Sequence, residues 1–504
     1  MAKSGIYLYF KPIQKQFHLA TSGIYYIFVS KNVQMLVGRF EEIEILNRKY
    51  DSDKSEFVAL YGRRRIGKTY LIRSVFRDKF TFHFTGMANV SLKSQLTNFH
   101  NTLQDQHPNP DLKQAESWID AFRQLRTIIE KSRRPKKVIF LDELPWLDTM
   151  NSNFIPALEH FWNGFASQRS DILLIVCGSA ASWMIQKLIN NKGGLHNRIT
   201  QKLRIEPFSI RDCAQLLTHK HIQLEPYQLV QLYMVLGGIP YYWDAIEKGK
   251  SAAQNIDTLC FGKTGLLATE FENLFKSLFN KSERHELIIQ LLSKKNKGLT
   301  RDEICTLGNF TNGGSLTRLL NELEESGFIK RYHPYGKKIK NSLYQLVDFY
   351  SLFYLKWIKG KKTQDQNFWV NILDNSQYKA WSGYTFELIC LTHIKEIKLA
   401  LGISGMNTEE SAWRSANSEN GAQIDLIIDR KDGIIHLCEM KFAKDPFQID
   451  KKYDLELKNK IQVFRTETKS KKTLFLTFIT PFGIKSNAYS NTVQNSLTLQ
   501  ALFN

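Results

Sequence analysis

The segment Gly62–Thr69 has the residue types and spacing of a loop that binds phosphate. It fits the pattern G-x-x-x-x-G-K-[ST] and lies between an apolar strand-like run and a helix-like run. The glycines let backbone N–H groups curl around phosphate oxygens, and a helix N-terminus favours an anion. Lys68 can neutralise the β- and γ-phosphates, and the Thr69 hydroxyl can ligate Mg²⁺. The sequence therefore predicts that ATP and Mg²⁺ bind at a site made of Gly62, Arg63, Arg64, Arg65, Ile66, Gly67, Lys68, Thr69 and Tyr70.

Two acidic residues follow the apolar run Val138–Leu141 farther along the chain. At the end of a buried parallel strand, Asp142 can hold Mg²⁺ through water, and Glu143 can polarise an attacking water. Alone, the pair would fit an ordinary strand that ends in surface acids. Because it lies downstream of a complete phosphate loop, we interpret it as the second half of the nucleotide site.

A third group of residues that could do chemistry lies near the C-terminus. The turn Lys431–Gly433 suits a three-residue hairpin whose register places Asp425 opposite Glu439. Since side chains alternate along a strand, Asp425, Glu439 and Lys441 share one sheet face, and Glu387 lies on a long helix expected over 378–399. Carboxylates and a lysine so arranged can bind Mg²⁺ and activate a water for phosphodiester attack. The alternative is an ordinary hairpin with a surface ion pair.

The elements that must position these residues divide the chain into blocks. A length of 504 residues suggests about three domains. Strand-like and helix-like runs alternate over 35–265, which is typical of a parallel α/β sheet. Three helices and a hairpin over 270–360 predict a winged helix, and 375–504 combine a long helix with further strands. Residues 1–34 are either an added strand pair or translated upstream sequence.

The charge of the chain points to a polyanionic partner. Lys and Arg number 69 against 49 Asp and Glu, a formal net charge of +20. Between Lys330 and Lys362, nine Lys and Arg accompany one acid, Asp348, and aromatic residues such as Tyr344 and Trp357 interleave. This fits a patch that contacts a nucleic-acid backbone and stacks on bases, with DNA expected before RNA. A solvated linker or a domain-docking surface is the alternative.

The phosphate loop adds three consecutive arginines, Arg63–Arg65. They either face solvent or bind the acidic surface of a protein partner. Their spacing does not decide between these interpretations.

Cysteine usage and hydropathy bound the compartment. The six cysteines are scattered without a C-x-x-C pair, and the apolar runs are only as long as a strand. A disulfide framework, a zinc ribbon and a membrane span are therefore not expected. The sequence favours a reduced, cytoplasmic protein without membrane contact.

These motifs resemble the AAA+ and STAND group of P-loop ATPases, and more closely an archaeal-type family of prokaryotic ATPases. Tyr61–Thr69 matches that family's Y-G-R-R-R-x-G-K-T loop, Val37–Glu42 its V-G-R-x-x-E box, and Gly237–Tyr242 its lid-helix signature. The resemblance implies that Ser179, after the next apolar strand, senses the γ-phosphate or positions water. It also suggests Arg198 as a γ-phosphate sensor, although a surface arginine fits equally well.

The C-terminal residues resemble PD-(D/E)xK nucleases, which have a restriction-endonuclease-like fold. Asp425, with Glu439-x-Lys441, matches the core of the motif, whereas Gln423-Ile424 precede Asp425 and the proline is absent. The resemblance implies that Asp425 and Glu439 hold a metal ion, that Lys441 orients the nucleophile and that Glu387 assists.

Three hypotheses for the function follow. In the leading one, an ATP-hydrolysing switch repositions the C-terminal domains on nucleic acid, and Mg²⁺-dependent cleavage stays open. In the second, the ATPase gates a non-cleaving domain that binds nucleic acid or a protein. In the third, a STAND-type sensor docks an acidic protein partner. The arginine for hydrolysis comes either from Arg198 or from a neighbouring subunit in a homo-oligomer.

Overall fold

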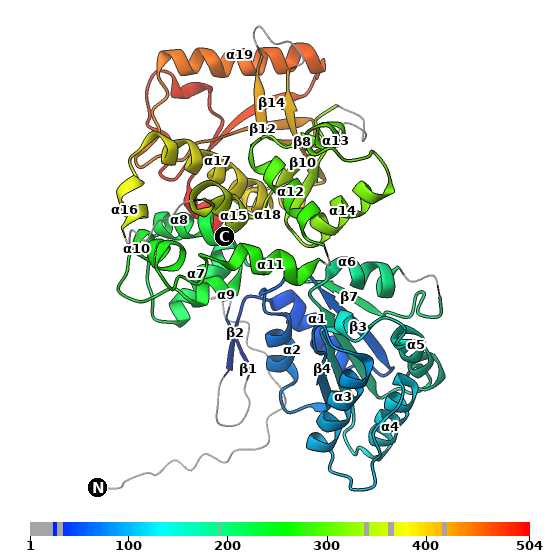
Figure 1. Ribbon diagram of the computed structural model, residues 1–504. Coiled ribbons are helices and arrows are strands. Elements are labelled where there is room, and N and C mark those ends of the chain that lie inside the picture. The colour runs from blue at the N-terminus through cyan, green and yellow to red at the C-terminus, as the bar shows by residue number, and fades with distance from the viewer. Residues whose placement is uncertain are drawn as a thin grey trace, which may run out of the picture.

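A five-stranded parallel sheet organises the first half of the chain (Figure 1), in the order β4-β5-β6-β3-β7. The computed structural model describes residues 24–27, 34–190, 193–279, 281–336, 342–360, 367–415 and 421–504. The strands are β3 Glu56–Tyr61, β4 Phe80–Thr85, β5 Lys137–Asp142, β6 Ile172–Gly178 and β7 Gln201–Arg204. Central strands β5 and β6 are buried along their whole length, as expected for a parallel sheet covered on both faces.

Helices cover both faces of this sheet because its strands are apolar on both sides. Along β3, Val58 and Leu60 join one hydrophobic core, whereas Phe57 and Ala59 join another. The first core takes in α1 (Phe40–Tyr50) and α2, and the second takes in α3, α4 and α5. The bounds of the last four helices are α2 Lys68–Phe76, α3 Leu92–Gln106, α4 Trp118–Lys131 and α5 Phe154–Gly164. The expected α/β fold with a parallel sheet is confirmed.

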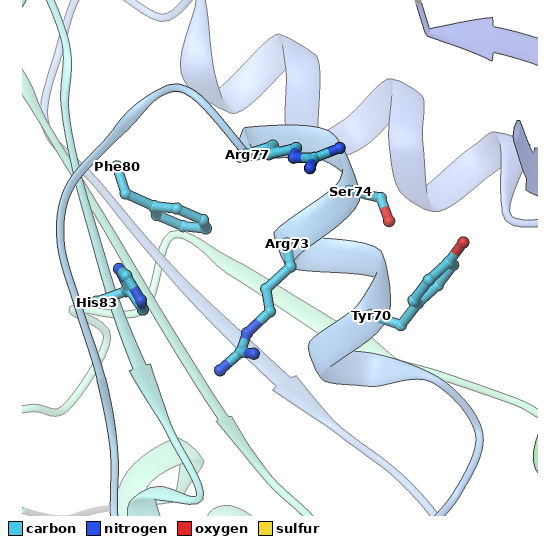
Figure 2. A pocket seen from close by; sticks show the side chains of 6 residues that line it. All are labelled: Tyr70, Arg73, Ser74, Arg77, Phe80 and His83. Carbon is cyan, nitrogen blue, oxygen red and sulfur yellow. The ribbon is translucent and has the colours of Figure 1, made fainter. Parts of the chain in front are cut away.

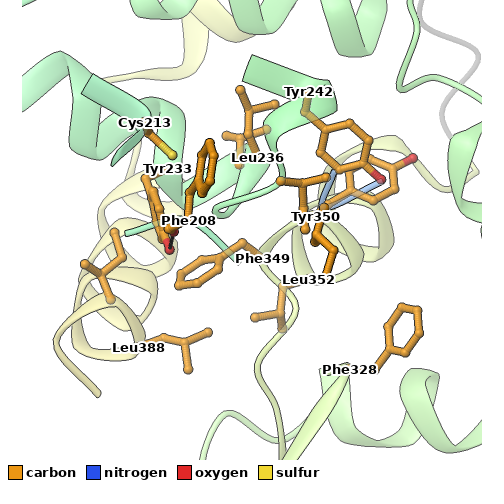
Figure 3. Packing of buried hydrophobic residues seen from close by; sticks show 14 of the residues in the cluster. Phe208, Cys213, Tyr233, Leu236, Tyr242, Phe328, Phe349, Tyr350, Leu352 and Leu388 are labelled. Carbon is orange, nitrogen blue, oxygen red and sulfur yellow. Dashed lines mark hydrogen bonds between the residues drawn. The ribbon is translucent and has the colours of Figure 1, made fainter. Parts of the chain in front are cut away.

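The first of these cores continues into the C-terminal half. Figure 3 shows Phe208 and Tyr233 packed with Phe349 and Leu388, which come from far later in the chain. The helices involved are α7 Ile210–His219, α8 Pro226–Leu236, α9 Pro240–Asp244, α10 Ala252–Ile256, α11 Glu270–Leu278, α15 Phe349–Phe353, α16 Phe368–Ile372, α17 Ser376–Thr392 and α18 Ile394–Ala400. The expected boundary near 265–270 stays a prediction, because apolar packing runs across it.

The glycine-containing segment Gly237–Tyr242 meets Phe208, which follows strand β7, inside this core. The Phe208 N–H donates to Gly238 O at 2.7 Å, and the Tyr233 hydroxyl donates to Phe208 O at 2.8 Å. A Cβ at Gly238 would lie 1.9 Å from Phe208 O, so only glycine permits this approach. Gly238 and Tyr233 therefore hold α8 against the segment that follows the edge strand β7.

The middle block contains the three expected helices and a small sheet. These are α12 Glu283–Ser293, α13 Arg301–Gly308 and α14 Gly314–Glu325, with a sheet in the order β8 (Leu299–Thr300), β10 (Leu343–Leu346), β9 (Ile329–Tyr332). A reciprocal capping box between Thr300 and Glu303 starts α13. The C-terminal end of α14 contacts the parallel sheet, because Glu325 of α14 pairs with Arg204 of β7 at 3.6 Å. The winged-helix identity of this block stays a prediction.

A mixed sheet forms the C-terminal block, in the order β11-β12-β13-β14-β15. Its strands are β11 Thr408–Arg414, β12 Gln423–Arg430, β13 Ile434–Met440, β14 Thr473–Ile479 and β15 Asn495–Leu497, and α19 (Lys451–Thr468) lies across it (Figure 1). Leu426 faces Cys438 and Asp429 faces Ile435 across the hairpin, which is the register that the turn predicts. Strands β11 and β15 were not predicted.

The prediction of one continuous helix over 378–399 is wrong, because His393 separates two helices, α17 and α18. Its ring nitrogen Nε2 accepts the Ile210 N–H at 3.1 Å, and its Nδ1 lies 2.9 Å from Ile389 O. His393 thus satisfies the N-terminus of α7 instead of continuing a helix, and burial lowers the pKa of its imidazole. A tertiary contact overrides the local helical pattern.

The basic stretch Lys330–Lys362 needs a correction. Tyr344 and Trp357 are buried in the core, so the interpretation that they stack on bases is wrong. Asp348, its one acid, is buried too. Five of its nine basic residues fall at positions 337, 338, 340, 361 and 362, outside the described residues.

The N-terminal segment is described only in part. Strand β1 (Ile24–Ile27) pairs antiparallel with β2 (Gln34–Val37). Residues 1–23 and 28–33 lie outside the described residues, so the two interpretations of 1–34 stay open. Within the described part of the chain, no helix is long and apolar enough to cross a membrane.

Candidate functional site

The phosphate loop connects β3 directly to the N-terminus of α2. Gly62 has φ +138°, Arg65 has φ +68° and Gly67 has φ +85°. A Cβ at Gly62 would lie 2.4 Å from Ile205 O, so the loop passes close to the segment after β7. These left-handed residues turn the backbone so that α2 begins at Lys68 with its positive end at the loop.

Lys68 is buried inside this loop. Its amine donates to Gly62 O at 3.0 Å and to Arg63 O at 2.8 Å. Burial lowers the pKa of Lys68, while Cys177, Glu143 and Asp142 act in the opposite direction. The structure therefore places a cationic side chain at the centre of the loop, as the motif predicts.

Thr69 and Asp142, separated by 73 positions, meet beside the loop. The Thr69 hydroxyl donates to Asp142 Oδ2 at 2.9 Å. Asp142 Oδ1 accepts from the Glu143 N–H at 3.0 Å and from Cys177 Sγ at 2.7 Å. A hydroxyl and a carboxylate in contact are hard oxygen donors that suit Mg²⁺. The sequence analysis did not predict Cys177 as a partner of Asp142. Its position on a buried strand, two residues before Ser179, could have indicated this contact.

Glu143 and Ser179 meet at the ends of neighbouring strands β5 and β6. Glu143 Oε2 accepts from the Ser179 N–H at 3.2 Å and from its hydroxyl at 3.0 Å. Glu143 itself is in the left-handed region, with φ +48°. Such strain in a non-glycine residue is held only by surrounding contacts, and it is common where a side chain must be aimed.

Two predicted site residues are not brought into this group. Arg198 is exposed on the turn before β7, and its backbone N–H donates to Leu195 O at 3.1 Å. Tyr70 is 51% exposed and lines a cavity of about 360 Å³ between α2 and β4, with Arg73 and His83 (Figure 2). A sensor role for Arg198 stays a prediction.

The loop arginines do not behave as either interpretation of the sequence expected. Arg63 is buried, forms an ion pair with Asp348 and lies 5.0 Å from the centre of the Phe328 ring. Arg65 forms an ion pair with Glu270 at 2.6 Å. Both side chains therefore bind acids of this same chain, far away in sequence, with Arg63 buried and Arg65 24% exposed.

Arg39, in the V-G-R box, is a site residue that the sequence analysis did not assign. Its guanidinium donates to Ile66 O at 3.1 Å and to Glu206 O at 2.7 Å. It also lies 4.6 Å from the centre of the Phe208 ring. Arg39 thus ties the phosphate loop to the segment that holds the lid.

The C-terminal carboxylates gather on one face of the mixed sheet. Lys441 Nζ lies 2.9 Å from Glu439 Oε1. Burial and the neighbouring Asp425 raise the pKa of Glu387 to about 8, with Lys441 opposing them. Asp425 accepts a hydrogen bond from Gln423. The structure brings all four predicted residues into one electrostatic cluster.

Glu439 is the most heavily compensated of these acids. Besides Lys441, it accepts from the Tyr453 hydroxyl at 2.5 Å and from Lys460 Nζ at 2.8 Å. Burial acts to raise the pKa of Glu439, but the two lysines and Tyr453 outweigh it and lower that pKa. The Glu439–Lys441 ion pair considered from sequence is present, but the Glu439 side chain is only 10% exposed, so the pair is largely buried on the Glu439 side. Tyr453 on α19 was not predicted.

The donor set does not yet form a closed metal cage. Over the described ranges, no group of three or more His, Cys, Asp or Glu residues is placed to hold a metal ion. Metal binding by Asp425 and Glu439 therefore stays a prediction, and Glu439 would have to exchange its lysine partners for the ion.

Comparison with known proteins identifies the first half. Residues 36–246 match a family described as an ATPase domain predominantly from Archaea. Over these residues the chain is similar to archaeal-type ATPase domains. An uncharacterised protein of Methanocaldococcus jannaschii is 27% identical over 405 residues, 78% of this chain and 84% of that one. An uncharacterised ATP-binding protein of the same organism is 47% identical over 47 residues, 9% of this chain and 80% of its own.

Solved structures are similar at a lower level. A Walker-type ATPase of Pyrococcus abyssi is 17% identical with a TM-score of 0.46, over 64% of this chain and 96% of that chain. The Aeropyrum pernix ORC2 protein, in ADPNP–ADP complexes, is 17% identical with a TM-score of 0.38, over 64% and 93%. The matched ATPase domain contains the phosphate loop, Asp142 and Ser179, whereas the C-terminal carboxylate cluster lies outside it.

Glu387→Gln tests the charge state of the cluster beyond the ATPase domain. The folded-state pKa is raised from 4.5 to about 8, so the charge of Glu387 destabilises the fold increasingly as pH rises through this interval. We expect the apparent Tm of the wild type to fall by several degrees more than that of Glu387→Gln between about pH 6 and about pH 9. Thermal unfolding at a series of pH values measures this.

The matched control is Glu456→Gln, an exposed acid on α19. It should keep the pH profile of the wild type. Identical profiles for the wild type and Glu387→Gln would contradict the raised pKa of Glu387.

Proposed function

We propose that the protein is an ATP-hydrolysing switch whose ATPase domain controls a C-terminal half that binds nucleic acid. The observation that carries the proposal is the meeting of Thr69 with Asp142 and of Ser179 with Glu143, beside the phosphate loop. These contacts join three strand ends at one edge of a parallel sheet, where such sheets bind ligands. An ordinary strand that ends in surface acids would not need these contacts.

Each residue then has a definite role. Lys68 neutralises the β- and γ-phosphates, and the backbone N–H groups of the loop hold them. Thr69 and Asp142 would hold Mg²⁺, which supplies charge neutralisation at the transferring phosphoryl group. Glu143 orients the attacking water, and Ser179 fixes the Glu143 carboxylate. Hydrolysis needs an arginine as well, from exposed Arg198 or from a neighbouring subunit of a homo-oligomer.

The loop arginines supply the coupling. Asp348, the partner of Arg63, caps α15 by accepting the Ser351 N–H at 3.0 Å. Glu270, the partner of Arg65, lies in the first turn of α11. A change in the phosphate loop on nucleotide binding therefore pulls on two helices of the C-terminal half.

Nucleic acid is the proposed partner because of the net charge of +20 and the chemistry of the C-terminal block. We assign 270–360 as a winged helix and 375–504 as a PD-(D/E)xK-like domain. On α14, Ser315, Thr317 and Arg318 are exposed, and Arg318 pairs with Glu322 of the same helix at 3.8 Å, whereas the C-terminal end of α14 is docked on Arg204. A protein partner is the alternative for this surface.

A second candidate for the C-terminal block is a domain that binds without cleaving. The observation favouring it is the neutralisation of Glu439 by Lys441 and Lys460. In the cleaving alternative, Asp425 and Glu439 would hold Mg²⁺, which activates water, and Lys441 would orient that nucleophile.

Lys68→Ala tests the ATPase. Loss of the central cation should lower the rate of ATP hydrolysis by about 100-fold or more, since charge stabilisation of the phosphates carries this chemistry. Phosphate release is measured with and without DNA or RNA, and with the divalent ion removed by a chelator. Lys93→Ala, an exposed lysine on α3, should match the wild type. Unchanged hydrolysis by Lys68→Ala would overturn the site assignment.

Glu270→Gln tests the coupling. Glutamine keeps an acceptor for the Tyr242 hydroxyl, which lies 3.2 Å away, but removes the charge that holds Arg65. Basal hydrolysis should stay within about twofold of the wild type, while stimulation by nucleic acid should fall several-fold, because a coupling of 1–3 kcal/mol is typical. Glu272→Gln, exposed on the same helix, is the control. Full stimulation of Glu270→Gln would contradict the proposed coupling.

Plasmid nicking with Mg²⁺ or Mn²⁺ decides between the cleaving and non-cleaving candidates. If the cluster cleaves, Asp425→Ala and Lys441→Ala should each lower nicking by at least about 100-fold, since each removes a group from the reacting centre. Lys452→Ala, an exposed lysine on α19, is the control. Nicking that survives in both variants would point to a contaminating nuclease and leave the non-cleaving candidate.

A further inference from the structure

A basic cavity lies where the middle and C-terminal blocks meet. It has a volume of about 370 Å³ and is enclosed by α12, by the π-helical turn Tyr354–Ile358 with the segment around it, and by α17. Three lysines line it, namely Lys294, Lys356 and Lys359. No acidic residue is among its described lining residues, and across the described chain none of the three amines has a carboxylate within ion-pair distance.

The other walls are mixed: Gln290, Ser293 and Asn296 are polar, whereas one side is apolar and aromatic. Leu352, Leu355 and Trp381 form one side, and Tyr384 closes the cavity toward the mixed sheet. A volume of this size holds one nucleotide. Lysines on one side and apolar or aromatic walls on the other are the features with which proteins hold a phosphate and the adjoining sugar and base.

The cavity lies next to the carboxylate cluster, with Tyr384 between them. Tyr384 and Glu387 lie one turn apart on α17, so they share a face of that helix. The Gln345 side chain donates to the Tyr384 hydroxyl at 3.1 Å and to Asn296 O at 2.9 Å. Burial, with a contribution from Glu387 and Asp425, raises the pKa of Tyr384 to about 12. Tyr384 is therefore the wall between the basic cavity and the acids.

A second link runs along the turn after α12. Lys297 contacts the side chain of Gln423, and Gln423 in turn contacts Asp425. Lys294 and Lys297 belong to the same short turn, so one end of it faces the cavity and the other faces the cluster. A strand that crosses this turn would meet lysines first and carboxylates next.

We propose that this cavity binds one nucleotide of a nucleic-acid strand, with its phosphate on Lys294, Lys356 and Lys359, and so fixes where the strand passes the Glu387 and Asp425 carboxylates. This rests on the proposed nucleic-acid function. An acidic peptide fits less well, because it offers no sugar and base to lie against Leu355 and Trp381. A phosphodiester carries its charge on the backbone and presents neutral sugar and base to the apolar wall.

The test replaces all three cavity lysines by alanine. Binding of fluorescently labelled single-stranded and double-stranded DNA, and of single-stranded RNA, is measured by anisotropy over a range of salt concentrations. The three lysines hold one phosphate, and loss of one phosphate contact lowers the salt slope by about 0.7–0.9, so the triple variant should lose about 1 from the slope. We expect its affinity to fall by about tenfold or more at moderate salt, with basal ATP hydrolysis unchanged.

The matched control removes three exposed lysines from the ATPase domain, Lys93, Lys113 and Lys131. It changes the net charge by the same amount and should keep nearly wild-type affinity and slope. Equal losses of affinity in the two triple variants would show that the net charge of the protein causes the effect, and would overturn the cavity site. Stronger competition by polyglutamate than by unlabelled oligonucleotide would also overturn it, in favour of an acidic protein partner.

These outcomes are separate from a failure of the proposed function. Nucleic acid bound equally by the wild type and the cavity variant would leave the ATP-driven switch intact and reject only this site. Absence of any nucleic-acid binding, together with ATP hydrolysis that depends on Lys68, would reject both the site and the nucleic-acid partner but keep the ATPase.

Discussion

The buried ion pair between Arg63 and Asp348 joins the phosphate loop to the C-terminal half of the molecule. Arg63 belongs to the phosphate loop and Asp348 caps α15, and each side chain is at most 4% exposed. Removing one partner of such a pair typically costs about 3–5 kcal/mol, because the other charge stays buried without compensation. The loop and α15 therefore cannot change position independently. A change in loop conformation on nucleotide binding would therefore also move α15 in the C-terminal half.

The shared core extends this constraint to the carboxylate cluster. Phe349, the first residue of α15, packs on Tyr233 of the lid, and Tyr233 packs on His393 at the end of α17. The same α17 carries Glu387 into the cluster. Packed interiors move between discrete arrangements instead of deforming smoothly, so a shift of α15 is transmitted along α17. The proposed coupling of the two sites would therefore run through α15 and α17, which both pack against Tyr233.

Local patterns predicted what local spacing controls. The phosphate loop, the capping box at Thr300 and the hairpin register of Leu426 with Cys438 each depend on residues close in sequence, and each is observed. Arg63 and Asp348 are 285 positions apart, and nothing in either neighbourhood specifies the other. The break at His393 and the burial of Trp357 likewise come from tertiary contacts. Sequence patterns therefore predicted the phosphate loop and the strand that ends at Asp142, but not the contacts that join them to the rest of the chain.

The carboxylate cluster is asymmetric in a way that a structural hairpin would not need. Lysines and Tyr453 hold the pKa of Glu439 down, whereas burial and Asp425 push that of Glu387 up to about 8. A buried carboxyl without a paired cation is costly, and an apolar residue of similar size would remove the cost. Acids whose environments separate their pKa values are characteristic of sites that move protons or bind charged ligands. The asymmetry therefore favours a site that handles charge, and the lysine cavity beside it supplies the opposite sign.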